Sequence, residues 1–131
     1  MTQKRLAVAG GTLLALSGIA NTILGIQTGI LIYEPYPGGK LGDVGIVAGL
    51  VAFVIGLAII FLVSPLYVQK SRKALVWGGI LTIILGHLGA IAGALFIGTA
   101  GMILCYIAGI WVLITVKKKP ATLDTTKTSS Q

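Results

Sequence analysis

The sequence predicts an all-α fold, an integral membrane four-helix bundle, and three observations lead to it. The 131-residue chain is 56% hydrophobic and 10% charged, whereas a soluble domain carries about 25% charged residues. No charged residue lies between Lys73 and Lys117, and this stretch is much longer than the about 20 residues of one bilayer crossing. Glycines and prolines divide the chain into apolar segments. We predict a four-span membrane domain, 1–120, and a disordered cytoplasmic tail, 121–131.

The boundaries of the spans follow from the breaks between these segments. The spans are predicted at about 6–32, 44–67, 74–97 and 100–116. The segment 34–43 holds two prolines and three glycines and separates the first two spans. Pro65 has no backbone N–H, which predicts a kink or a stop near the end of the second span. The residues from Gly98 to Gly101 are predicted to form the turn between the last two spans.

Charge placement predicts the orientation. The basic residues next to the spans are Lys4, Arg5, Lys70, Arg72, Lys73, Lys117, Lys118 and Lys119. With four spans these eight lie on one side and only Lys40, beside Glu34 and Asp43, on the other. The positive-inside rule makes the side with the eight basic residues cytoplasmic, together with both termini. The net charge of +7 therefore predicts topology in the cell membrane and contact with anionic lipids at the cytoplasmic face, not nucleic-acid binding. A cleaved signal peptide is disfavoured because the first apolar run continues to Ile32.

The first and third spans resemble one another, which indicates an internal repeat. Residues 5–25 and 73–93, offset by 68 positions, share seven identities in 21, whereas this composition gives about two by chance. Both spans enter the membrane from the same side. Any duplication is therefore of a helical hairpin in parallel orientation, although the second and fourth spans match poorly.

Two sets of glycines, spaced seven residues apart, are predicted to pack helices. They are Gly11, Gly18 and Gly25 in the first span and Gly79, Gly86 and Gly93 in the third. A seven-residue step returns nearly to the same helix face, so each set forms a groove in which another backbone can approach closely. We predict that the first and third spans cross along these grooves, with Asn21 bonded across the interface. The alternative is that glycine is simply common in membrane helices.

His87 is the only histidine and lies within a span, which makes it a candidate polar functional residue. The simplest interpretation is a neutral imidazole hydrogen-bonded to a carbonyl or to a hydroxyl such as that of Tyr106. A role at a partner interface, or proton or metal chemistry, are the alternatives. Met102 and Cys105 are the other possible ligands at this depth, and two ligands without carboxylates make a poor metal site. No catalytic, cofactor-binding or metal residue is predicted.

Other polar residues offer little chemistry. Neither a Ser-His-Asp arrangement nor an H-E-x-x-H motif is present, and no acidic residue lies inside a span, where a coupled transporter would use one. We therefore expect no enzymatic activity and no cofactor. Cys105 is interpreted as a small buried apolar residue. Gln27 needs a partner or water, and Glu34 and Asp43 are interpreted as solvated loop charges.

The basic loop Ser71-Arg72-Lys73 is followed by Trp-Gly-Gly-Ile-Leu at 77–81, a Gly/Ala-rich hairpin and a last span that ends in lysines. In this layout the chain resembles uncharacterised small four-span, glycine-rich membrane proteins of prokaryotes, of archaeal type. The resemblance covers most of the chain and implies the four-span fold. It implies no activity and no residue roles.

These features favour a structural, accessory or assembly subunit of a larger membrane complex, with other membrane subunits or copies of itself as partners. Small size, the absence of catalytic motifs and the glycine faces support this interpretation. The alternative is a small homo-oligomeric channel or carrier for ions or small solutes, with His87, Asn21 or Gln27 in a pathway. The scattered polar residues favour the first. A third interpretation is a hydrophobic envelope protein of a virus or vesicle.

Overall fold

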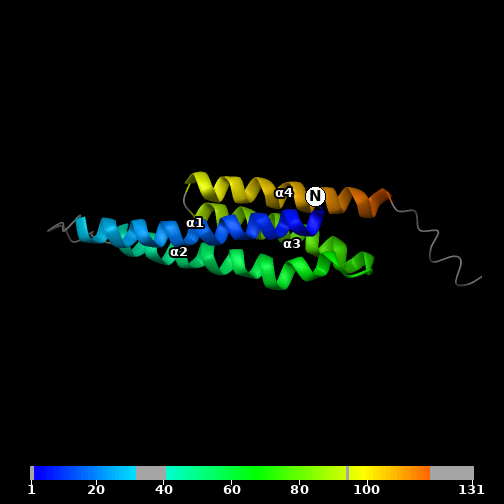
Figure 1. The fold of residues 1–131 in the computed structure, drawn as a ribbon, viewed down its shortest axis with the longest axis horizontal. Helices are drawn as coiled ribbons and strands as arrows, with labels where there is room; N and C mark the ends of the chain where they lie inside the picture. Colours follow the sequence, from blue (N-terminus) through cyan, green and yellow to red (C-terminus); the bar gives the residue numbers. More distant parts are fainter. Residues whose placement is uncertain (1, 32–40, 94, 119–131) are drawn as a thin grey trace, which may run out of the picture.

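The computed structural model describes residues 2–31, 41–93 and 95–118, and these form an up-and-down bundle of helices (Figure 1). The helices are α1 (Gln3–Leu31), α2 (Leu41–Ala58), α3 (Arg72–Ala92) and α4 (Leu95–Lys118), with no strand in the described ranges. Four helical segments are long and apolar enough to cross a membrane, which confirms the predicted all-α four-helix bundle. The loop residues 34–40 and the predicted tail 121–131 lie outside the described residues.

The chain after α2 changes helix type where the sequence predicts a kink or a stop. A π-helical turn, Ile59–Val63, leads into a short 3-10 helix, Ser64–Tyr67. Pro65 cannot donate a backbone hydrogen bond to the preceding turn. The Ser64 hydroxyl donates instead to the carbonyl oxygen of Ile60 at 2.6 Å. The loss of one backbone donor and the gain of a side-chain donor explain why regular α-helix does not resume after the π-helical turn.

The turn between α3 and α4 lies earlier than predicted. Gly93 directly follows α3 and has extended backbone (φ −94°, ψ 178°), and α4 has begun by Leu95. The predicted turn at Gly98–Gly101 is therefore wrong, because those residues lie inside α4. They serve close packing: a Cβ atom added to Gly101 would lie 3.0 Å from the carbonyl oxygen of Gly10 in α1.

The helices pack mainly as two hairpins. α1 lies against α2 on one side and α4 on the other, α3 lies against α4, and α1 has few contacts with α3. A Cβ atom on Gly18 would lie 2.5 Å from the Gly49 carbonyl oxygen of α2, and one on Gly86 would lie 2.6 Å from the Cys105 Cβ atom of α4. The prediction that the first and third spans cross along the glycine grooves is therefore wrong. Each groove chiefly receives the next helix of the chain.

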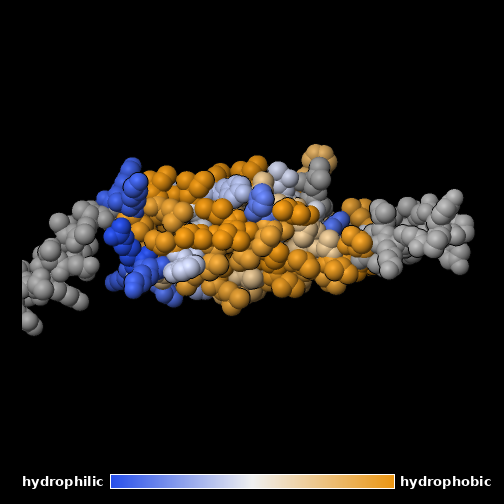
Figure 2. Space-filling model, turned by 180° about the vertical axis from the view of Figure 1, so that it is seen from behind, coloured by the Kyte–Doolittle hydropathy of each residue, from blue (hydrophilic) through white to orange (hydrophobic). Residues whose placement is uncertain are grey.

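The core is built from few side chains. Leu14, Ile59 and Cys105 are fully buried and form one cluster, and Leu6, Ala7 and Ala108 form a second. The face shown in Figure 2 is mostly apolar (orange), and exposed large apolar side chains lie on all four helices. This distribution is typical of a membrane bundle, in which packing rather than hydrophobic burial holds the helices together.

The two hairpins differ in length. The side-chain amide of Asn21 donates to the carbonyl oxygen of Ala92 at 3.0 Å, so the end of α3 lies beside α1 well before α1 ends. α1 continues from there to Leu31, alongside the beginning of α2 (Figure 1). The α1–α2 hairpin therefore projects beyond the α3–α4 turn.

Candidate functional site

The most unusual polar residue, His87, lies on the outer face of α3 and is exposed. Its Nδ1 atom lies 2.7 Å from the Tyr106 hydroxyl of α4, and the two rings stack with centroids 6.2 Å apart. The predicted hydrogen bond between the imidazole and a hydroxyl is therefore present. The structure records no partner for the other ring nitrogen, Nε2, among the described residues.

The surroundings of this His87–Tyr106 pair are apolar. Exposed neighbours on α3 are Ile84, Leu88 and Ile91. On α4, Tyr106 helps to line a shallow groove of about 410 Å³, and the other lining residues are Ile103, Ile107, Ile110, Trp111 and Ile114. The pair is thus a polar spot on an otherwise apolar outer face.

Cys105 is directed away from this pair and into the bundle. It is fully buried. Its Sγ atom packs directly on Gly10 of α1, since a Cβ atom added to that glycine would lie only 2.6 Å away. It therefore fills the space that glycines of α1 and α3 leave open. His87 and Cys105 lie at a similar level along the bundle but on different faces. In the described part of the chain, no three His, Cys, Asp or Glu side chains come together.

Asn21 joins α1 to α3, as predicted, although the glycine grooves chiefly face other helices. The Ala92 carbonyl that accepts its hydrogen bond lies in the last turn of α3, where carbonyls lack a partner within the helix. The Asn21 side chain of α1 therefore caps the C-terminal end of α3. Gln27, by contrast, is exposed on the part of α1 that projects beyond α3.

We expect Asn21→Leu to lower the free energy of unfolding by about 1–3 kcal/mol, because the partly buried Ala92 carbonyl loses its donor. Thermal unfolding in detergent measures the effect. Thr12→Val is a suitable control, because the exposed Thr12 hydroxyl bonds only to the Val8 carbonyl of its own helix. A loss in Asn21→Leu no larger than in this control would contradict the capping role.

Two inter-helix hydrogen bonds were missed by reasoning from the sequence. The Tyr67 hydroxyl lies 2.8 Å from the Thr82 hydroxyl, which itself donates to the Gly78 carbonyl at 2.7 Å. Gln3 Nε2 donates to the Thr115 hydroxyl at 3.1 Å. The four-residue spacing of Gly78 and Thr82 is a usable signal, because a threonine hydroxyl can bond to the carbonyl four residues earlier and still meet a neighbour.

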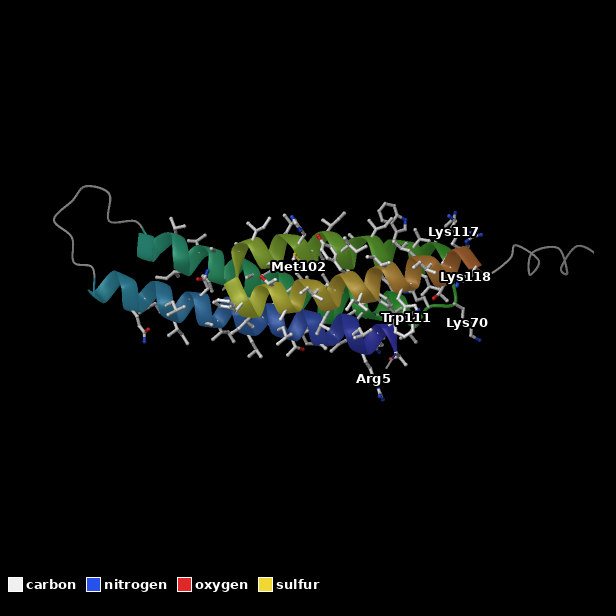
Figure 3. All side chains as sticks on the ribbon, turned by 90° about the horizontal axis from the view of Figure 1, so that it is seen from above. Arg5, Lys70, Met102, Trp111, Lys117 and Lys118 are labelled. Carbon is white, nitrogen blue, oxygen red and sulfur yellow. The ribbon has the colours of Figure 1, made fainter. Side chains whose placement is uncertain are left out.

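One end of the bundle is strongly basic. Figures 2 and 3 show the charged side chains gathered there, and those described are Lys4, Arg5, Lys70, Arg72, Lys73, Lys117 and Lys118. Trp111 lies close to the same end (Figure 3) and is 45% exposed. Amphipathic rings beside basic groups are typical of a boundary between hydrocarbon and lipid headgroups.

The fold and the site define a bundle of four apolar helices with a basic end and a polar pair on its outer face. A comparison of the chain with known protein families, curated proteins and solved structures found no match.

Proposed function

We propose that the chain is a non-enzymatic multi-pass membrane protein that acts as a structural, accessory or assembly subunit of a larger membrane complex. The observation that supports this most is the use of polar side chains inside the bundle. Asn21, Tyr67 and Gln3 all hold one helix to another. Every buried side-chain nitrogen or oxygen atom in the described residues has a hydrogen-bond partner. Such a bundle suits a rigid scaffold, because the polar groups in its interior are already hydrogen-bonded to one another and few are left to bind a substrate.

The proposed orientation places the basic end and both termini in the cytoplasm, in contact with anionic lipids. All the described lysines and arginines support it by their position at this end. Each basic residue near an anionic membrane surface contributes about 1 kcal/mol to the attraction. A cysteine in place of Ser71, between α2 and α3, should react with an impermeant maleimide only after cells are permeabilised. Labelling of intact cells would contradict this orientation.

A duplicated hairpin is a further part of the proposal. A Cβ atom on Gly11 would lie 2.9 Å from the Gly56 carbonyl oxygen of α2. Gly79 is the equivalent residue 68 positions later, and a Cβ atom there would lie 3.1 Å from the Gly109 carbonyl oxygen of α4. Equivalent glycines thus face the next helix of the chain in both halves. Gly93 departs from this pattern, because it lies against Ser17 of α1. Independent expression of 1–70 and 71–131 tests the idea, and two hairpins that reassemble into the bundle are expected.

The subunit proposal is tested by mild-detergent purification of the tagged chain from native membranes. Co-purifying proteins and their ratios are identified by mass spectrometry. We expect unrelated membrane proteins in fixed stoichiometry, and their identity would name the process. A homogeneous assembly of this chain alone would contradict the proposal. A flux assay in liposomes, with wild type and His87→Ala, would then test the channel or carrier interpretation.

A further inference from the structure

The His87–Tyr106 pair is incomplete within one chain. His87 Nδ1 is bonded to the Tyr106 hydroxyl at 2.7 Å, whereas Nε2 has no partner among the described residues. The imidazole is exposed on the outer face of α3, among apolar side chains such as Ile84 and Leu88. Inside a bilayer, lipid chains offer no hydrogen-bonding group, so an unpaired polar atom there is costly.

We infer that a second copy of this chain completes the site, in a two-fold symmetric dimer whose axis lies along the membrane normal. Two copies inserted in the same direction hold equivalent residues at equal depth. A two-fold interface brings the same surface of both copies together. His87 of one copy therefore meets the partner's Tyr106, and the reverse contact follows from the symmetry.

In the dimer, each hydrogen-bond donor of the two imidazoles and two hydroxyls has an acceptor within the same four groups. A neutral imidazole has one donor and one acceptor nitrogen, and a tyrosine hydroxyl both donates and accepts. The Tyr106 hydroxyl donates to Nδ1 of its own His87, which leaves a proton on Nε2. That N–H donates to the partner's Tyr106 hydroxyl. Repeated by the symmetry axis, this forms a closed ring of four hydrogen bonds that needs no other chemical group.

The apolar residues beside the pair also suit a second copy. Exposed isoleucines on α4 stand at 103, 107, 110 and 114, with spacings of four, three and four residues. Parallel helices with this spacing pack side chains into the holes of the facing helix. The groove of about 410 Å³ that these residues line with Tyr106 is the place for isoleucines of the partner's α4. A groove of about 310 Å³ on α2, around Val54, has no polar group, and lipid suffices to cover it.

Cysteine cross-linking locates the interface. The purified full chain is reconstituted in phosphatidylcholine vesicles with Ile107→Cys on α4 or Val54→Cys on α2, which are 47% and 61% exposed in the single chain. Cys105 remains in place because it is fully buried. We expect a cross-linked dimer with Ile107→Cys and monomer with Val54→Cys. Cross-linking at Val54 alone, or at neither position, would overturn the inference.

The monomer–dimer equilibrium in the same vesicles tests the hydrogen-bonded ring. His87→Phe and Tyr106→Phe each remove both inter-chain bonds, so each should weaken the dimer about tenfold, and the double variant should be no weaker than either. Tyr67→Phe is the matched control, since its hydroxyl bonds to Thr82 inside the chain, and it should dimerise like wild type. Energy transfer between labelled copies at several protein-to-lipid ratios measures the equilibrium. Unchanged dimerisation of the His87 and Tyr106 variants, or a monomeric wild type, would overturn the inference.

This inference goes beyond the proposed subunit function and can fail separately from it. Dimers of the purified chain in vesicles are expected whether or not other subunits are present. Unrelated partners recovered from native membranes, together with a monomeric chain in vesicles, would support the subunit function and overturn the dimer. A dimer in vesicles, with no unrelated partners recovered from native membranes, would support the dimer and contradict the subunit function.

Discussion

Gly18→Leu is expected to abolish the folded bundle. A Cβ atom at this position would lie 2.5 Å from the Gly49 carbonyl oxygen and 2.8 Å from the Phe53 Cα atom. These are backbone atoms of α2, which cannot move aside unless the two helices separate. Separation loses dispersion contacts along the whole α1–α2 interface, and in a membrane these contacts are the main attraction between helices. We expect aggregated protein, or protein without a cooperative unfolding transition, in mild detergent.

A graded series separates this steric effect from the general cost of replacing glycine. Gly18→Ala adds only the Cβ atom and should already cost about 1–3 kcal/mol, because it overpacks a tight contact. Gly98→Ala should cost less, since its Cβ atom would lie 3.2 Å from the Ser17 Oγ atom and 3.4 Å from Ala90. Gly86→Leu meets the Cys105 side chain at 2.6 Å and should also be severe. Wild-type yield and thermal stability of Gly18→Leu would contradict the proposed close packing.

Leu14→Ala is expected to lower the free energy of unfolding by about 2–5 kcal/mol, the cost of a cavity in a packed core. Leu14 is fully buried, and its side chain lies against Gly101 and Gly89. These glycines have no side chain that could turn into the empty space, so on their side the cavity stays unfilled. The midpoint of thermal or denaturant unfolding in detergent measures the effect.

Leu16→Ala is the matched control for this cavity. Leu16 lies on the same helix, two positions later, and is 50% exposed. Its replacement by alanine should change stability by less than about 1 kcal/mol, as for other substitutions away from the core. Equal losses in the two variants would show that Leu14 is not part of a packed interior.

The number and approximate extent of the helices could be predicted because the membrane restricts the choice of structure. A chain within hydrocarbon must satisfy its backbone hydrogen bonds locally, so long apolar segments become helices. Pro65 correctly marked a change of helix geometry because the loss of its backbone donor does not depend on the neighbours. The turn at Gly93 was missed. Gly98 and Gly101 look equally suited to turning, and only the contacts with α1 show that they serve packing.

The chemistry of the site was easier to predict than its neighbours. An imidazole within a span needs a partner, and Tyr106 was recognised as a suitable hydroxyl; the bond is present. The glycine grooves were assigned to the wrong pair of helices, because a seven-residue spacing specifies a face but not what lies against it. That His87 is exposed could not be derived either, since nearly every position around α3 is apolar and the faces look alike in the sequence.

The unequal lengths of the two hairpins have a consequence for the surrounding lipid. The 29 residues of α1 extend about 43 Å and the 21 residues of α3 about 31 Å, from the rise per residue of an α-helix. A bilayer with a hydrocarbon core of about 30 Å matches only the shorter hairpin. The candidate membrane span of α1 has 25 residues and that of α3 has 21, so we expect the bundle to tilt or the lipids beside α1 to stretch. We therefore expect one molecule to present two hydrophobic thicknesses to the surrounding lipid.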